Sequence, residues 1–119
     1  MHIWNVTRDQ VLATRIRVAT HPWARGRGLI GMPPLQPGEA LIIRPCKGIH
    51  TWLMSYPIDV IYVDREERVL DLDEAIPPWR FGRIRWQSAY VIELPAGVLR
   101  RTGTRPGDQL AFTQSSDLA

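Results

Sequence analysis

The residues best suited to chemistry gather between Cys46 and Asp64, in the segment C-K-G-I-H-T-W-L-M-S-Y-P-I-D-V-I-Y-V-D. It holds the chain's single cysteine, one of three histidines, a tryptophan, a methionine and two aspartates. A cysteine within hydrogen-bonding reach of a histidine can act as a thiolate nucleophile, and Asp59 or Asp64 could orient the imidazole. Cys46 and His50 therefore suggest a thiol-dependent enzyme. The alternative is that Cys46, which follows a proline, is a small buried hydrophobic residue.

A soft-metal site is the second chemistry that this segment suggests. His50 and Met54 are ligand types suited to copper. We expect Ile49–Met54 to be a strand, in which these two residues lie about 13 Å apart, too far to share one metal ion. Cys46 could join His50 only if the chain folds back at Lys47–Gly48. Two ligands make a weak site, so we predict no metal and no cofactor.

Two carboxylates interrupt apolar strands. Asp59 shares a strand face with apolar residues, where it must find hydrogen-bond donors or become neutral. We expect it to accept backbone N–H groups of the Ser55–Pro57 turn, with a ligand contact as the alternative. Glu93 poses the same question beside the Pro95–Gly97 turn and receives the same interpretation. Asp108 is interpreted as a turn residue.

The segment Trp79–Trp86 interleaves three aromatic residues with three arginines. Aromatic rings stack on bases or sugars, and arginines pair with phosphates or carboxylates. The same pattern also fits a loop whose Ile84 and Trp86 face the core while Arg83 and Arg85 lie in water. Binding sites gather in loops on rigid β scaffolds, which favours a recognition surface for an anionic or sugar-like ligand.

The elements that must position these residues are mostly short strands. The expected strands are His2–Val6, Val11–Ala19, Ala40–Arg44, Ile49–Met54, Ile58–Asp64, Arg68–Leu72, Ala89–Leu94 and Gln109–Thr113. Two short helices are expected, at about Pro22–Ile30 and within Pro95–Thr102, and Ala75–Trp86 is expected to be irregular because of its prolines. Short strands joined by Pro-Gly turns predict a mainly β fold, a sandwich or a partly open barrel.

Length and composition narrow the class of protein. A chain of 119 residues fits one domain, residues 1–119, and a formal net charge of +3 does not favour nucleic acid as a partner. A single cysteine excludes an internal disulfide. The N-terminal residues lack the basic and apolar regions of a signal peptide, and no apolar run is long enough to span a bilayer. We therefore expect a cytoplasmic protein without a membrane partner.

Four blocks in order resemble the DUF192 family, also called UPF0127. They are G-L-I-G-M (28–32), I-H-T-W-L-M-S-Y-P-I-D-V-I-Y-V-D (49–64), V-I-E-L-P-A-G (91–97) and P-G-D (106–108). The spacing matches over about residues 10–113. The resemblance implies a compact, jelly-roll-like β-sandwich and implies no activity. Many relatives have a Gly-Leu-Met block where Ile30 stands here. Many also carry an exported N-terminal extension that we do not expect here, so no periplasmic role is carried over.

The leading hypothesis is a non-catalytic domain that binds an unidentified small ligand, anionic or sugar-like, or a protein partner. The residues predicted to form its binding surface are His50, Trp52, Met54, Asp59, Trp79 and Arg80. Two alternatives stay open. One is a thiol-dependent enzyme that uses Cys46 and His50. The other is single-stranded nucleic-acid binding through the Trp79–Trp86 loop. The sequence predicts no particular oligomeric state.

Overall fold

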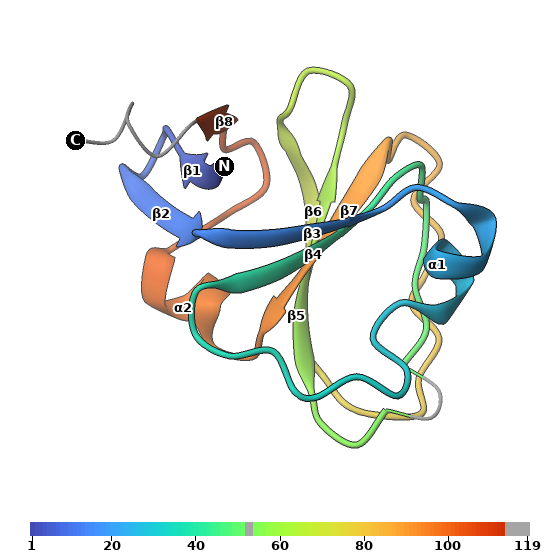
Figure 1. The fold of residues 1–119 in the computed structure, drawn as a ribbon. Helices are drawn as coiled ribbons and strands as arrows, with labels where there is room; N and C mark the ends of the chain where they lie inside the picture. The colour runs from blue at the N-terminus through green and yellow to red at the C-terminus, as the bar shows by residue number, and fades with distance from the viewer. Residues whose placement is uncertain (52–53, 114–119) are drawn as a thin grey trace.

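The computed structural model of the chain describes residues 1–51 and 54–113 (Figure 1). Within these residues it has eight strands and two short helices. The strands are β1 (His2–Asn5), β2 (Gln10–Ala13), β3 (Arg15–Ala19), β4 (Glu39–Ile43), β5 (Ile58–Val63), β6 (Val69–Ile76), β7 (Tyr90–Pro95) and β8 (Leu110–Thr113), and the helices are α1 (Pro22–Arg27) and α2 (Val98–Thr102). The predicted mainly β fold with two short helices is confirmed.

The strands form two sheets. A three-stranded sheet has the order β2-β1-β8, and a five-stranded sheet has the order β3-β4-β7-β5-β6. Strands β3 and β4 are parallel, and the other neighbours are antiparallel. Figure 1 shows the small sheet and α2 on one side of the molecule and α1 on the other.

The expected single strand Val11–Ala19 is wrong, because β2 and β3 belong to different sheets. The chain breaks at Thr14, where the amides of Thr14 and Arg15 both donate to the carbonyl of Gly38, with N···O distances of 2.8 and 2.9 Å. Two successive amides that point at one acceptor cannot continue a regular ladder, in which successive amides point in opposite directions. The bend lets the first half pair with β1 and the second half with β4.

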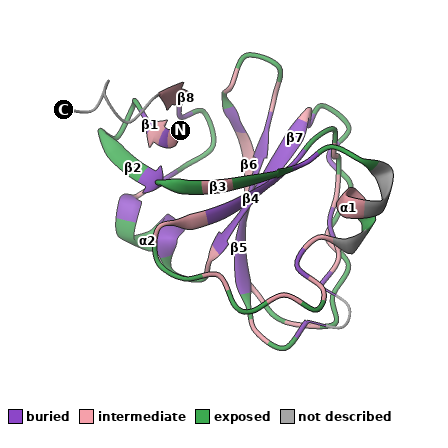
Figure 2. Cartoon of the chain, viewed as in Figure 1, coloured by how far each residue is buried: buried purple, intermediate pink, exposed green. Residues whose placement is uncertain are grey.

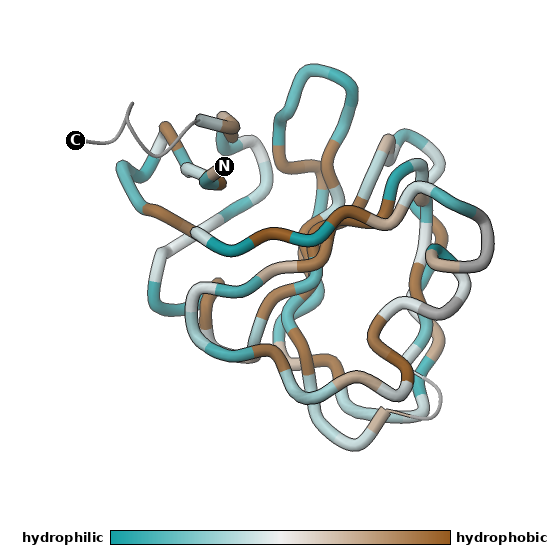
Figure 3. Tube along the Cα trace, viewed as in Figure 1, coloured by the Kyte–Doolittle hydropathy of each residue, from teal (hydrophilic) through white to brown (hydrophobic). Residues whose placement is uncertain are grey.

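The centre of the larger sheet is buried on both faces. Strands β5 and β7 are buried almost throughout (Figure 2). Most residues of these strands are hydrophobic, whereas the connection between β5 and β6 is hydrophilic (Figure 3). Because side chains alternate along a strand, Ile92 and Leu94 pack in one hydrophobic cluster with the small sheet and α2. Val91 packs in a second cluster on the side of α1.

Asp59 faces the side of the sheet that carries α2, and it is fully buried. Its carboxylate accepts hydrogen bonds from the amides of Ala75 (2.7 Å), Gly97 (3.0 Å) and Leu99 (2.9 Å). The backbone donors expected for Asp59 are present, but they do not come from the Ser55–Pro57 turn. Two of them belong to the start of α2, whose first N–H groups have no partner within the helix.

The segments 47–51 and 80–85 pair with each other, and residues 49–51 and 54 are not in the regular strand predicted for Ile49–Met54, of which residues 52 and 53 lie outside the described residues. The carbonyls of Lys47 and Ile49 accept hydrogen bonds from the 80–85 segment, and the amide of Thr51 donates back to it. Within the described residues the only ladder contact here is an isolated bridge between His50 and Phe81. The two segments that the sequence singled out for binding therefore lie side by side.

Arg85 fixes this irregular pair to the sheet, which contradicts the alternative in which Arg85 lies in water. Its side chain is 8% exposed, its guanidinium lies 3.9 Å from the centroid of the Tyr62 ring, and it donates to Asp71 and Asp73 on β6. A planar guanidinium can hydrogen-bond to two carboxylates and stack on an aromatic ring at the same time, so Arg85 can be buried with its charge compensated. The alternative in which Ile84 and Trp86 face the core is wrong, because these residues are 54% and 71% exposed.

We predict that Asp59→Ala lowers the free energy of unfolding by about 3 kcal/mol, because three backbone N–H groups lose a charged acceptor. Urea denaturation followed by circular dichroism measures the loss. Glu66→Ala, at an exposed hairpin position, is the matched control and should change stability by no more than ~0.5 kcal/mol. Equal stabilities for the two variants would contradict the role given to Asp59.

Candidate functional site

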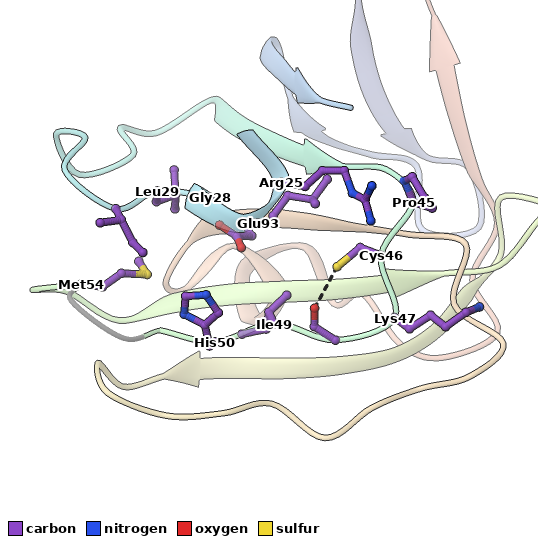
Figure 4. Close-up of a pocket in the computed structure, with 14 residues that line it drawn as sticks. Arg25, Gly28, Leu29, Pro45, Cys46, Lys47, Ile49, His50, Met54 and Glu93 are labelled. Atoms are coloured by element: carbon purple, nitrogen blue, oxygen red, sulfur yellow. Dashed lines mark hydrogen bonds between the residues drawn. The ribbon is translucent and has the colours of Figure 1, made fainter. Parts of the chain in front are cut away.

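A cavity of about 400 Å³ lies between α1, the segment 45–50 and β7 (Figure 4). The apolar side chains that line it are Leu29, Ile30, Ile43, Pro45, Ile49 and Met54. The polar side chains that line it are Arg25, Cys46, Lys47, His50 and Glu93. A mostly apolar hollow with a few polar groups is typical of a small-molecule site.

Glu93 forms the floor of this pocket. It lies on β7 opposite Leu41 of β4 on one side and Val60 of β5 on the other, both in the hydrophobic cluster on the side of α1. Its side chain is buried, with 3% of the residue exposed, and its Oε2 has no hydrogen-bond partner among the described residues. Burial raises the pKa of Glu93 to about 8. Near neutral pH the carboxyl is therefore mostly protonated and can donate a hydrogen bond.

The expected structural explanation for Glu93 is wrong. The Pro95–Gly97 turn was expected to supply its donors, but the amide of Gly97 donates to Asp59. In the register of β5 with β7, Asp59 lies opposite Leu94 and Glu93 lies opposite Val60, so the two carboxyl groups face opposite sides of the sheet. The start of α2 lies on the side of Asp59, which leaves Glu93 without those amides.

Further polar atoms near the pocket also lack partners. The Nε of Arg25 on α1 and the Nδ1 of His50 are buried and have no hydrogen-bond partner among the described residues. The hydroxyl of Tyr56 is also buried without a hydrogen-bond partner among the described residues. Burial raises the pKa of Tyr56, and the nearby Glu93 carboxylate raises it further. Buried polar atoms in folded proteins normally have hydrogen-bond partners. Several unpaired polar atoms around one pocket therefore indicate a ligand-binding site.

Cys46 lines the pocket, and its thiol is hydrogen-bonded to the backbone. Its Sγ donates to the carbonyl of Gly48, with an S···O distance of 2.9 Å (Figure 4). Burial raises the pKa of Cys46, so the thiol stays protonated near neutral pH. No hydrogen bond joins Cys46 to His50 among the described residues. The geometry thus places the two side chains of the enzyme hypothesis in one pocket without activating the nucleophile.

The structure brings together only some of the side chains that the sequence predicts for binding. His50 and Met54 line the pocket together with Cys46. Asp59 lies on the other face of the sheet, with its oxygens occupied by backbone amides. Trp79 and Arg80 are exposed on the 77–86 loop and do not line the pocket. Trp52 lies outside the described residues.

Arg25 and Glu93 are pocket residues that the sequence did not assign to a binding site. Glu93 carried a signal, since a carboxylate in the apolar run V-I-E-L must be paired or neutral. No sequence signal marked Arg25, because it is one of fourteen arginines and its position depends on how α1 packs. Gly28, the first residue after α1, lies close to Glu93: a Cβ there would lie 3.9 Å from the Oε1 of Glu93.

A second hollow, of about 590 Å³, lies beside the β5–β6 hairpin and the segment 86–89. None of its described lining residues has a buried polar side-chain atom without a partner. Across residues 1–51 and 54–113, no three His, Cys, Asp or Glu side chains are close enough to hold a metal ion. Neither described helix is long and apolar enough to cross a membrane.

The sequence is similar to a family of proteins and to several of its members. The model of the DUF192 family, described as "Uncharacterized ACR, COG1430", matches residues 4–112. The UPF0127 protein of Thermococcus sibiricus is 33% identical over 110 residues, which cover 89% of this chain and 71% of that protein. The UPF0127 protein of Pyrococcus furiosus is 26% identical over 115 residues, covering 92% and 97%.

Solved structures agree with this match at the level of the fold. A protein of unknown function from Novosphingobium aromaticivorans DSM 12444 is similar with a TM-score of 0.80 at 20% identity, covering 93% of this chain and 82% of that one. A protein from Sinorhizobium meliloti 1021 gives a TM-score of 0.76 at 20% identity, covering 92% and 89%. The matches confirm the resemblance seen in the four sequence blocks.

Glu93→Gln should change how stability depends on pH. The folded-state pKa of about 8 lies above the ordinary value of 4.5, so between these values the folded chain holds a proton that the unfolded chain releases. Stability of the wild-type protein then falls as pH rises from 4.5 to 8, with a contribution of about 1.4 kcal/mol per pH unit. Glutamine removes this contribution, and Glu66→Gln should not.

The measurement is urea denaturation of the three proteins at intervals from pH 4.5 to pH 9. Stability curves of wild type and Glu93→Gln that differ by a constant across this range would contradict a raised pKa at Glu93.

Proposed function

We propose that this chain, which belongs to the DUF192 family, is a non-catalytic domain that binds a small anionic or sugar-like ligand in the pocket around Glu93. The observation that supports the proposal is the set of unpaired buried atoms that surround one cavity: Arg25 Nε, His50 Nδ1 and Glu93 Oε2. Leaving such atoms unpaired costs about 1–3 kcal/mol each. A ligand that supplies their partners recovers that free energy on binding.

Binding is favoured over thiol chemistry because the pocket does not activate Cys46. The thiol donates to Gly48, and its pKa is raised by burial. A catalytic cysteine needs the opposite, a lowered pKa and a base within hydrogen-bonding reach. The same thiol is a useful reporter, since it lines the pocket.

Ligand binding should protect Cys46 from alkylation. We expect millimolar short-chain carboxylates or neutral monosaccharides to raise the melting temperature and to slow the reaction of Cys46 with N-ethylmaleimide at pH 7. Arg25→Ala should weaken the protection by a carboxylate. Arg101→Ala, which removes an exposed arginine from α2, is the charge-matched control and should keep it. If neither class of compound slows alkylation, the proposed function is wrong.

The exposed face of the 79–86 loop favours a second candidate function, the binding of single-stranded nucleic acid. Phe81 and Trp86 are 72% and 71% exposed, and the side chain of Arg83 is 80% exposed. Exposed rings can stack on bases while neighbouring arginines contact phosphates. This surface lies outside the lining of the pocket around Glu93, so the two candidates can be tested separately.

A double variant tests this second candidate. We expect the wild-type protein to be retained on an immobilised single-stranded oligonucleotide at low salt and released as salt rises. Arg80→Ala/Arg83→Ala should lose retention, whereas Arg100→Ala/Arg101→Ala, with the same change in net charge, should keep it. No retention of the wild-type protein at low salt, or equal loss in both double variants, would exclude the loop as a nucleic-acid site.

A further inference from the structure

We infer that the ligand of the pocket around Glu93 is a small aliphatic monocarboxylate, whose carboxylate accepts hydrogen bonds from Glu93 and Arg25. Its short apolar body packs against Leu29, Ile49 and Met54. The inference rests on the proposed function and narrows it from two ligand types to one chemical class.

Glu93 acts as a hydrogen-bond donor to the ligand. A carboxyl group that lies between Leu41 and Val60, with one oxygen unpaired, is stable in its neutral form. A neutral carboxyl has one O–H group, and the strongest acceptor that it can meet is a carboxylate, which forms a short, charge-assisted hydrogen bond. A ligand ammonium would require Glu93 to ionise in an apolar site, which burial opposes.

Arg25 supplies the positive charge that balances the ligand carboxylate. Arg25 carries a buried Nε–H with no partner among the described residues, and it lines the same cavity. Lys47 is the other cation of the lining, but its Nζ already donates to the carbonyls of Trp86 (2.7 Å) and Ser88 (3.2 Å). Two of the three N–H groups of Lys47 are thus held by the backbone, whereas the buried Nε–H of Arg25 has no partner among the described residues. No ion pair joins Arg25 and Glu93 in the described part of the chain, so both can serve one carboxylate.

The lining of the pocket does not suit a sugar. A monosaccharide has a hydroxyl group on nearly every carbon, and each needs a partner when it is buried. Much of this cavity is lined by carbon: Leu29, Ile43, Ile49 and Met54 offer no hydrogen bonds. A ligand with polar atoms at one end and an alkyl chain at the other matches the lining better.

The donor role of Glu93 predicts a pH dependence of binding. If the carboxylate binds only when Glu93 is protonated, and Glu93 has a pKa of about 8, the dissociation constant rises about 30-fold between pH 6.5 and pH 9.5. Other groups face Glu93 here: Arg25 from α1, Cys46 and His50 from the segment 45–50, and Tyr56 from the turn before β5. Assigning the pH dependence to Glu93 therefore needs a variant in which only that carboxyl is removed.

The experiment is isothermal titration calorimetry of the full chain with sodium butyrate, using butyramide, butylamine and glucose as matched probes. We expect butyrate to bind at pH 6.5, to bind at least tenfold more tightly than each of the other three probes, and to lose about 30-fold in affinity by pH 9.5. Glu93→Gln, whose amide still donates, should bind butyrate within about threefold of wild type at pH 6.5 and should lose the pH dependence.

Several results would overturn the inference. They are tighter binding of butylamine or glucose than of butyrate, wild-type affinity for butyrate that does not change with pH, and loss of butyrate binding in a folded Glu93→Gln variant at pH 6.5. If glucose protects Cys46 from N-ethylmaleimide and butyrate does not, the monocarboxylate is wrong while the proposed function stands. If no probe binds or protects Cys46, both are wrong.

Discussion

Two carboxyl groups lie on neighbouring central strands of a sheet that is buried on both faces, and their different surroundings determine where a site can exist. Asp59 on β5 faces α2 and accepts three backbone amides, so its charge is used inside the fold. Glu93 on β7 faces α1, where hydrophobic neighbours leave one oxygen unpaired. Burying a carboxyl without partners destabilises a protein, because its charged form is excluded from water. Such a residue is a sound place to look for function.

The walls of the pocket follow from how that face of the sheet is closed. Helix α1 covers one part, and two irregular segments, 47–51 and 80–85, cover another by pairing with each other. Regular strands would present alternating side chains in a flat array, whereas this irregular pair turns His50 toward the cavity (Figure 4) and leaves Phe81 outside. Arg85 holds the pair against Tyr62 and β6. The pocket is therefore supported by the ion pairs of a buried arginine with two half-buried aspartates.

Much of the fold could be predicted from local sequence signals. Turns containing proline and glycine, such as that at Gly38, and the short helix that ends at Gly103 lie where the pattern indicates. The errors came from tertiary contacts. The break at Thr14 depends on Gly38, which is distant in sequence, and the burial of Arg85 depends on two aspartates of β6. The period-two pattern of a strand predicts that side chains alternate between the two faces of the sheet. It does not predict which element of the fold packs against each face.

The candidate site was predicted in part, for the same reason. The segment around Cys46 and His50 does contribute to the pocket, as its concentration of polar residue types suggested. The two groups that define the chemistry, Arg25 and Glu93, come from other segments of the chain. Alternation along β5 and β7 could have separated Asp59 from Glu93 only if the pairing register had been known. Because α2 lies on the same side of the sheet as Asp59, the amide of Gly97 donates its hydrogen bond to Asp59 and not to Glu93.

The central claim is that Glu93 is a neutral, unpaired carboxyl group at neutral pH. The most direct test is a titration of the Glu93 side-chain carboxyl carbon by ¹³C nuclear magnetic resonance in the folded protein, assigned by comparison with Glu93→Gln. The account predicts a midpoint near pH 8, and a higher midpoint in the presence of saturating butyrate. A midpoint close to the ordinary glutamate value of 4.5 would contradict it.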